Sequence, residues 1–340
     1  MSNKRSIIFS GIQPSGNLTL GNYLGALRNW VTLQNQYNCW FSLVDLHTIT
    51  VRQEPKVLRN RCYEVLALYL AAGINHNQHT IFLQSHVPTH TQLAWILNCY
   101  SYMGEISRMT QFKDKVKNNK INNNVGLFSY PILMASDILL YHTNLVPVGT
   151  DQKQHMELAR DLALRFNKIY GDVFTIPEVY YPPFGSRIMS LQEPTKKMSK
   201  SDTNPYATIF LSDSPDVISD KCKRAITDSG KEIYFDINQK PGIANLLVIL
   251  AAISGKPIET LVNELHNYTY DKFKGVVTEN LIELLRPLQQ RYQQLSKDLC
   301  YLDSILEHGA QEAIKVSQQT LHQVHKVLGF IPINIGCKQV

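Results

Sequence analysis

The chain contains no long hydrophobic run. Its longest apolar stretch, residues 246–253, is far shorter than the ~20 residues that a membrane-spanning helix needs. Too few apolar residues precede Gly11 to form the hydrophobic core of a secretory signal peptide. We therefore expect a cytoplasmic protein that has no membrane partner.

Cysteine is also scarce, and its spacing argues against several kinds of site. The six cysteines form no Cys-x-x-Cys pair; they are Cys39, Cys62, Cys99, Cys222, Cys300 and Cys337. Scattered cysteines of this kind are typical of reduced, structural thiols, and they predict no metal or iron–sulfur centre. The sequence also lacks both a Gly-x-Gly-x-x-Gly fingerprint and a P-loop.

The charge balance says little about partners. With 34 basic and 28 acidic residues, the net charge of +6 and the pI of about 8.8 permit a nucleotide or nucleic-acid partner without requiring one. A chain of 340 residues can bury roughly three quarters of its unfolded surface. That is enough for one large domain and a smaller one.

Short apolar segments alternate with helical patterns through residues 7–191. We expect strands at residues 7–9, 39–46, 80–84, 145–148 and 188–191. Between them we expect helices at residues 20–31, 56–72, 91–102, 131–141 and 151–170. This alternation predicts an α/β fold with a doubly wound, parallel, Rossmann-like sheet.

Beyond residue 205 the pattern becomes helical. Helices are expected at residues 213–227, 243–254, 258–268, 270–299 and 302–328. We therefore predict a Rossmann-like catalytic domain at residues 1–205 and a mostly α-helical second domain at residues 206–300. Residues 301–340 are expected to form a C-terminal helix that packs back on the first domain, followed by a tail.

Residues 195–202 concentrate lysines and hydroxyl groups. Three ammonium groups and three hydroxyls cannot pack in a core without losing their hydration. We interpret this segment as a mobile surface loop that closes on a strongly anionic ligand, such as the triphosphate of a nucleotide. A solvated turn is the alternative.

A glycine-rich turn at residues 10–17 joins the first expected strand to the first expected helix. In an open parallel sheet a phosphate binds at this place, because backbone N–H groups and the helix N-terminus point at the ligand. A plain tight turn would explain any one of these glycines. The second expected strand ends near His47, which is either a structural hydrogen-bonding group or a residue of the site.

The expected helix at residues 131–141 places a carboxylate on an apolar face. Pro131 suits its first turn, where no N–H is needed. By spacing, one face carries Met134, Asp137, Ile138 and Tyr141. A buried Asp137 is costly unless a donor or a charge satisfies it. Asp137 either makes an internal salt bridge or a helix-end contact, or it is a ligand-facing carboxylate that accepts one N–H or O–H.

Two further segments carry weaker signals. Asp151 and Gln154 make a plausible capping box for the helix at residues 151–170. Residues 108–126 interrupt the alternation with lysines and asparagines, which disfavour a regular element, and we expect a loop there.

Several strings in this chain together resemble one family. This chain carries the string Lys197-Met198-Ser199-Lys200-Ser201, which is similar to the second signature of the class I aminoacyl-tRNA synthetases. This chain resembles the tryptophanyl branch of that family at residues 11–25, 108–115, 130–141, 149–164 and 188–201, and the likeness extends over residues 7–329. Two departures stand out: Thr19-Leu20-Gly21-Asn22 replaces the His-Ile-Gly-His signature, and Thr150 replaces a glutamate.

The resemblance implies two reactions. ATP, with its Mg²⁺, activates L-tryptophan to tryptophanyl-adenylate and pyrophosphate, and tryptophan then passes to the terminal ribose of tRNA(Trp). It also implies a homodimer whose helical domain binds the anticodon arm. Candidate phosphate contacts, each also explicable as a solvated helix face, are Lys221, Lys223, Arg224, Arg286 and Arg291.

The resemblance assigns residues to three groups. The catalytic lysines are Lys197, Lys200 and Lys115. The ATP-binding residues are Gln13, Pro14, Ser15, Gly21, Asn22, Gly149, Thr150, Asp151, Ile188, Lys197, Met198, Ser199, Lys200 and Ser201. The tryptophan-binding residues are Asp137, Met134, Tyr130, Gln152, His47 and Phe9.

One position separates two related substrates. The tyrosyl enzymes carry Tyr-x-x-x-Gln-x-x-Asp where this chain has Met134 in place of the glutamine. A polarisable thioether suits a larger aromatic ring and leaves Asp137 to accept an indole N–H, a charge-assisted bond of about 1.5–3 kcal/mol. The alternatives are a tyrosine-specific synthetase, a small-metabolite nucleotidyltransferase and a non-catalytic RNA-binding relative.

Overall fold

A computed structural model describes residues 5–110, 113, 124–149, 152–181, 187–200 and 202–332. Within these residues the sheet has five parallel strands in the order β3-β2-β1-β4-β5. They are β1 (Ile7–Ile12), β2 (Asn38–Leu43), β3 (Thr80–Leu83), β4 (Leu145–Pro147) and β5 (Glu178–Tyr180). Because the strand order reverses between β1 and β4, a ligand crevice is expected at the carboxyl ends of these two strands.

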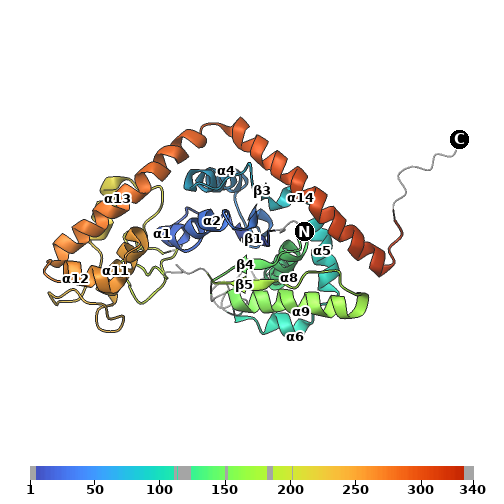
Figure 1. Ribbon diagram of the computed structural model, residues 1–340, viewed down its shortest axis with the longest axis horizontal. Coiled ribbons are helices and arrows are strands. Elements are labelled where there is room, and N and C mark those ends of the chain that lie inside the picture. The colour runs from blue at the N-terminus through green and yellow to red at the C-terminus, as the bar shows by residue number, and fades with distance from the viewer. Residues whose placement is uncertain are drawn as a thin grey trace.

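Helices cover both faces of the sheet, which explains why β1 and β2 are nearly continuous apolar runs. Figure 1 shows α4 (Pro55–Ala72) above the sheet, and α8 (Val125–Leu139) and α9 (Lys153–Tyr170) below it. The other helices that the structure describes before residue 200 are short: α1 (Leu20–Asn22), a π-helical turn (Tyr23–Leu27), α2 (Arg28–Leu33), α3 (Asp45–Thr48), a 3₁₀ turn (Gln84–His86), α5 (Thr89–Asn98) and α6 (Met103–Ser107). The predicted doubly wound α/β fold is confirmed.

The expected strand at residues 188–191 is wrong. Met189 forms only an isolated antiparallel bridge with Lys197, because the chain folds back on itself as a hairpin. The fifth strand of the sheet is instead β5, which the sequence did not reveal. Its residues are half-buried or exposed, as suits an edge strand, so no apolar run marks it.

The helix expected to begin at Pro131 begins earlier. Asn124 caps α8, and its Oδ1 accepts the backbone N–H of Leu127 at 2.9 Å. Pro131 therefore lies inside the helix and removes one internal hydrogen bond. The strong N-cap explains why the helix starts before the proline.

The predicted capping box of α9 is wrong at Gln154, while Asp151 lies outside the described residues. The side chain of Gln154 accepts the backbone N–H of Thr110 at 3.0 Å and the Thr110 hydroxyl at 2.9 Å. It therefore ties α9 to the segment after α6, and the helix begins after Gln152.

The helices after residue 205 are α10 (Pro215–Lys223), α11 (Pro241–Ser254), α12 (Ile258–Leu265), α13 (Tyr270–Leu295) and α14 (Leu299–Leu328). In Figure 1, α13 and α14 form the two sides of an arch over the sheet. One buried cluster joins Ile8 of β1 to Leu247 of α11 and Leu281 of α13. The apolar core is thus continuous across residue 205, and the domain boundary there stays a prediction.

The last helix, α14, packs against the sheet. The hydroxyl of Thr89 donates to the Ser317 hydroxyl at 2.7 Å, and Thr320 Oγ1 donates to the Leu140 carbonyl at 2.7 Å. Among the described residues, no single helix is long and apolar enough to cross a membrane; α11 and α12 pass that test only as a pair bent by 110°. The thiols of the described cysteines are free, as predicted.

Gly309 allows α14 to approach β3 closely. A Cβ at this position would lie 1.8 Å from the Ile81 carbonyl oxygen. We expect Gly309→Ala to lower the free energy of unfolding by roughly 1–3 kcal/mol, because the helix must move away from the strand. Chemical denaturation would measure this loss.

Gly275→Ala in α13 is the matched control for this substitution. Apart from its chain neighbours and the backbone of its own helix, no described atom lies within 4 Å of a Cβ built at Gly275. Alanine should therefore stabilise the helix by about 0.5–1 kcal/mol relative to glycine. Equal effects of the two substitutions would contradict the close packing of α14 on β3.

Candidate active site

The turn after β1 forms the first corner of the candidate site. Gly16 has a φ of 75°, which only glycine adopts readily, and the Ser15 N–H donates to the Gln13 carbonyl at 2.8 Å. Thr19 then caps α1: its Oγ1 accepts the Asn22 N–H at 3.2 Å, and Asn22 Oδ1 accepts the Thr19 N–H at 3.0 Å. The side-chain oxygen of Asn22 therefore belongs to the cap, and the side-chain NH₂ group is the part that can donate to a ligand.

The loop expected at residues 195–202 forms, as far as residue 200, the returning part of a hairpin at residues 188–200. The Met198 N–H donates to the Ile188 carbonyl at 3.0 Å, and the Ser190 N–H donates to the Lys196 carbonyl at 2.8 Å. Met198 is buried in the core, whereas Lys197 is exposed. The hairpin therefore has a buried apolar base and exposes Lys197.

Lys200 brings the hairpin and the first corner together. Its ammonium donates to the Ser15 carbonyl at 3.2 Å, and its Cδ lies 3.9 Å from a Cβ built at Gly16. A Cβ at Gly21 would lie 3.7 Å from Ile188 Cβ, so the base of the hairpin also reaches the helix start. Burial, and secondarily the charge of Arg61, lowers the pKa of Lys200 to about 8.

The second corner follows β4, the neighbour of β1 in the sheet. Gly149 is exposed there, and its carbonyl accepts the Gln152 N–H at 3.0 Å. Four predicted site residues lie outside the described residues and receive no structural account: Lys115, Thr150, Asp151 and Ser201. Ser199 lies on the hairpin, and its carbonyl accepts the Thr208 hydroxyl at 2.8 Å.

Asp137 lies in α8 at the centre of a buried polar network. Oδ1 accepts Gln84 Nε2 at 2.7 Å and His90 Nδ1 at 2.6 Å, and Oδ2 accepts His47 Nε2 at 2.8 Å. Burial would raise the pKa of Asp137, but hydrogen bonds and charge from the two histidines hold it below its ordinary value. Two histidines and an amide, rather than an arginine, thus satisfy the carboxylate.

The donors are divided unequally between the two oxygens of Asp137. A carboxylate oxygen can accept about two hydrogen bonds, so Oδ1 is filled and Oδ2 can accept one more. His90 Nδ1 must donate to the carboxylate, and His90 Nε2 lies 2.8 Å from the Tyr141 hydroxyl. Burial and the charge of Asp137 raise the pKa of Tyr141, which keeps this hydroxyl protonated.

Aromatic side chains surround this network. The ring of Tyr130 lies 6.3 Å from that of His47, and its hydroxyl bonds His155 Nε2 at 2.9 Å. Phe9 stacks on Tyr141 with ring centroids 5.6 Å apart. Met134 packs against the buried apolar cluster to which these two rings belong. The structure therefore brings Asp137, His47 and Tyr130 together beside the predicted Phe9 and Met134. Gln152 lies at the start of α9.

Sequence reasoning missed Gln84, His90 and Tyr141 as parts of this network. Gln84 directly follows β3, at the carboxyl edge of the sheet, which is the one signal that could have identified it. His90 lies on α5 with none of its surface exposed, and only the tertiary fold brings it to Asp137. His47 was expected at a strand end, but it lies in α3 just beyond β2.

Comparison with known proteins identifies the family of this chain. Residues 1–286 match the family model described as tRNA synthetases class I (W and Y). The chain belongs to this synthetase family. The likeness inferred from the sequence motifs is thereby confirmed.

Relatives of this synthetase match it over nearly its full length. A tryptophan–tRNA ligase of Clostridium tetani is 50% identical over 331 residues, which cover 97% of this chain and 98% of the relative. The crystal structure of tryptophanyl-tRNA synthetase from Mycoplasma pneumoniae has a TM-score of 0.87 at 36% identity and covers 98% of this chain and 100% of that one. The enzyme from Campylobacter jejuni, complexed with ADP and tryptophan, has a TM-score of 0.81 at 31% identity and covers 95% of this chain and 100% of that one.

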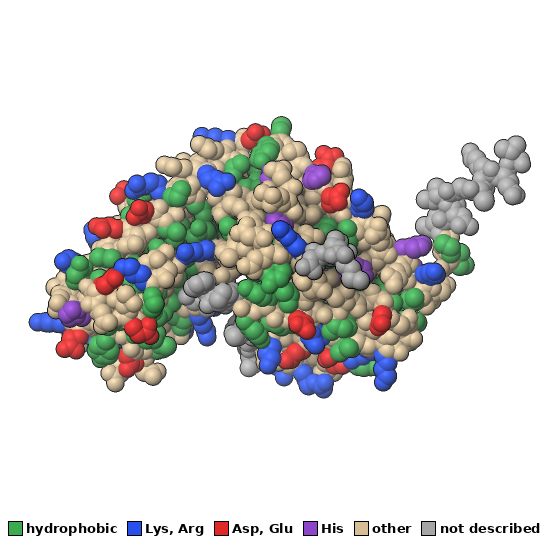
Figure 2. Space-filling view, viewed as in Figure 1, with side chains coloured by type: hydrophobic (Ala, Val, Ile, Leu, Met, Phe, Trp, Pro, Cys, Tyr) green, Lys and Arg blue, Asp and Glu red, His purple; other side chains and the backbone are tan. Residues whose placement is uncertain are grey.

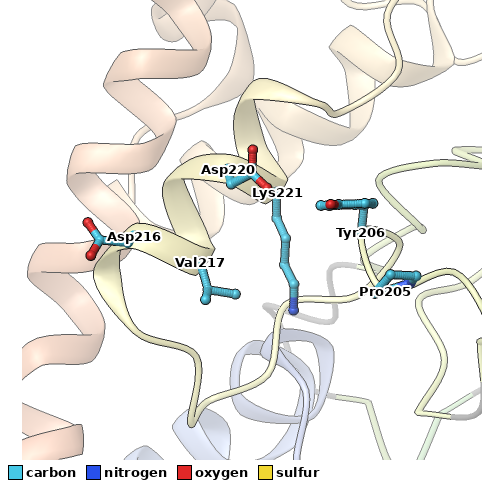
Figure 3. Close-up of a pocket in the computed structure, with 6 residues that line it drawn as sticks. All are labelled: Pro205, Tyr206, Asp216, Val217, Asp220 and Lys221. Carbon is cyan, nitrogen blue, oxygen red and sulfur yellow. The ribbon is translucent and has the colours of Figure 1, made fainter.

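A separate cavity of about 400 Å³ lies beside α10 in this synthetase (Figure 3). Pro205 and Tyr206 line one side, and Asp216, Val217, Asp220 and Lys221 of α10 line the other. Its two carboxylates repel phosphate, and Lys221 already pairs with Asp213 at 2.6 Å. The cavity therefore does not suit the triphosphate.

Two predicted phosphate contacts of the synthetase are engaged within the protein. Lys221 is buried and paired with Asp213, and Arg224 pairs with Asp220 at 2.8 Å. Figure 2 shows basic and acidic side chains interspersed over the visible face. Lys221 is therefore a structural residue, while the roles of Lys223, Arg286 and Arg291 stay predictions.

Proposed function

We propose that this synthetase is a tryptophan–tRNA ligase. The observation that carries the proposal is the buried Asp137 carboxylate, whose Oδ2 can accept one further donor beside Met134 and a group of aromatic rings. An indole offers one N–H on a large apolar ring, which suits a single free acceptor position beside apolar side chains better than a phenol does. The 50% identity to a tryptophan–tRNA ligase supports the same substrate.

In the first reaction a carboxylate oxygen of tryptophan attacks the α-phosphorus of ATP. The bond from that phosphorus to its bridging oxygen breaks, and pyrophosphate leaves with the electron pair. Mg²⁺ bound to ATP would supply a charge that screens the phosphate oxygens. Catalysis then needs positioning and charge stabilisation rather than an acid or base of unusual pKa.

The two corners and the hairpin are proposed to bind ATP. Backbone groups at Gln13, Pro14, Ser15 and Gly21 would seat the nucleotide, with Asn22 donating from its NH₂ group. Gly149 would contact the ribose and the backbone of Ile188 the adenine. Lys197 and Lys200 would neutralise the pyrophosphate, and the contact between Lys200 and Ser15 supports this arrangement.

In the second reaction a hydroxyl of the terminal ribose of tRNA(Trp) attacks the activated carbonyl carbon, and AMP leaves. The helices after residue 205 are proposed to bind the anticodon arm. We place the enzyme in the cytoplasm, where a reducing environment suits the free thiols of the described cysteines.

Amino-acid-dependent pyrophosphate exchange with all twenty amino acids tests this proposal. Exchange with tryptophan, and at least tenfold less with tyrosine and phenylalanine, is the expected result. A preference for tyrosine would indicate the related tyrosyl activity. No exchange with any amino acid would indicate a relative that has lost the reaction.

A homodimer is part of the proposal, because α5, α6 and the start of α8 expose large apolar side chains. Trp95 and Met103 are each 73% exposed and Val125 is 79% exposed, and both α5 and α6 pack on α8. A second copy of the chain would cover this apolar face. We expect Trp95→Glu to weaken the dimer about 30-fold or more, measured by analytical ultracentrifugation.

Ile237→Glu is the control for the dimer. Ile237 is 67% exposed in the segment before α11, outside the proposed face. This substitution should leave the sedimentation coefficient unchanged. The proposed face would be wrong if Ile237→Glu produced monomers and Trp95→Glu did not.

A further inference from the structure

In the hairpin at residues 188–200, each of the two paired segments has an inner side that faces the other segment and an outer side. The hydrogen bonds within the hairpin use only the inner sides. The bonds from Met198 to Ile188 and from Ser190 to Lys196 flank the bridged pair of Met189 and Lys197. In an antiparallel pair of this type, the N–H and C=O of the middle residue point away from the opposite strand. The backbone of Met189 therefore needs a partner on its outer side.

Asn245 of α11 is that partner. Its Oδ1 accepts the Met189 N–H at 2.9 Å, and its Nδ2 donates to the Met189 carbonyl at 2.9 Å. The amide thus replaces both bonds that a neighbouring strand would make. Asn245 is 4% exposed, so water has little access to compete for these bonds.

The hairpin consequently lies between two parts of the molecule. At its base it is bonded to α11, which packs against α13. At its returning end, Lys200 bonds to Ser15 in the turn after β1. A shift of Met189 would move the bridged Lys197 with it and would change where Lys200 meets Ser15.

We propose that Asn245 is a positioning residue for adenylate formation. By holding both backbone groups of Met189, it sets the hairpin so that Lys197 and Lys200 meet the phosphates at the first corner. This inference rests on the proposed role of the two lysines. Asn245 itself is bonded to the backbone of the hairpin and acts on the reaction through the two lysines.

The test is single-turnover adenylate formation by Asn245→Ala. A small misplacement of the reacting groups can cost about 100-fold in rate, and we expect activation to slow by about 10- to 100-fold. The KM for tryptophan should change less than about threefold, because the Asp137 network does not involve α11. Asn245→Asp keeps the acceptor for the Met189 N–H but turns a carboxylate oxygen toward the Met189 carbonyl, so it should also slow activation and gives a second variant.

Asn167→Ala is the matched control for lost stability. The Asn167 side chain also bonds loop backbone with both its groups, donating to the Phe174 carbonyl at 2.8 Å and accepting the Phe174 N–H at 2.9 Å. It lies near the end of α9, away from the hairpin. Asn167→Ala should lower the melting temperature to a similar degree while activation stays unchanged.

Asn245→Ala in a Lys197→Ala/Lys200→Ala background separates the inference from the proposed lysine role. If Asn245 acts through the two lysines, its removal should slow the Lys197→Ala/Lys200→Ala enzyme by less than about threefold, since coupled residues are non-additive. An equal slowing in both backgrounds, or no slowing by Asn245→Ala or Asn245→Asp, would overturn the inference. An unchanged rate in Lys200→Ala alone would instead overturn the lysine role.

Discussion

Lys200→Ala should slow tryptophan activation by about 100- to 1,000-fold, equivalent to ~3–4 kcal/mol, as for the loss of one donor to a developing negative charge. The ammonium lies over the Ser15 carbonyl, at the place where a phosphate would meet the turn after β1. Tryptophan binding should change little, because Lys200 belongs to the nucleotide side of the site. Rapid-quench measurement of adenylate formation, with tryptophan titrations, would check both expectations. An unaltered single-turnover rate would remove Lys200 from the mechanism.

The same lysine predicts a pH dependence. Since burial lowers the pKa of Lys200 to about 8, its positive charge is lost as pH rises through that value. The kcat/KM for ATP, which reports the free enzyme, should therefore fall above about pH 8. Lys200→Arg, whose guanidinium stays charged, should lose this descending limb. Between pH 8 and the ordinary lysine pKa the unfolded chain binds more protons, so stability rises with pH there.

Asp137→Asn should raise the KM for tryptophan by about 10- to 100-fold, because a charge-assisted hydrogen bond of about 1.5–3 kcal/mol is lost. The amide also presents an NH₂ group where a histidine donates, so the network around His47 and His90 loses an acceptor. Discrimination against phenylalanine should weaken, since no buried carboxylate is then left unpaired by a substrate without an N–H. Steady-state pyrophosphate exchange with both amino acids would measure these effects.

Asp228→Asn separates substrate recognition from the loss of a satisfied carboxylate. Asp228 also accepts three donors, from Lys240 at 2.8 Å, Tyr270 at 2.9 Å and the Gly230 N–H at 2.7 Å. This group ties the segment before α11 to α13, outside the Asp137 network. Asp228→Asn should lower the free energy of unfolding without changing the KM for tryptophan. A folded Asp137→Asn enzyme with a wild-type KM would show that the indole binds elsewhere.

The sequence predicts most of the fold where a segment's own residues decide its structure. Four strands and most of the longer helices follow from apolar periodicity, because their buried faces are long enough to repeat the pattern. The fifth strand, β5, has only three residues at a sheet edge and carries no such pattern. Residues 188–191 carry an apolar run, yet Asn245 takes the backbone bonds of Met189, so this run forms a hairpin edge and not a sheet strand.

The candidate site is predictable by residue type but not by its partners. A carboxylate on an apolar helix face identifies Asp137 as a group that needs a donor. Its donor Gln84 follows β3, and its donor His90 lies in α5. Only the packing of α5 on α8 brings His90 near Asp137. Likewise, the Asn124 cap decides where α8 begins, although Pro131 seemed the better local signal.

Ile8 leaves the ribosome among the earliest described residues, yet its buried cluster also contains Leu302, Ile305 and Leu306. At roughly 5–20 residues per second, translation delivers these last members some 15–60 s after Ile8. During that interval the nascent chain exposes apolar surface that is buried in the folded protein. Its synthesis therefore suits a cell in which chaperones bind such surfaces until α14 emerges.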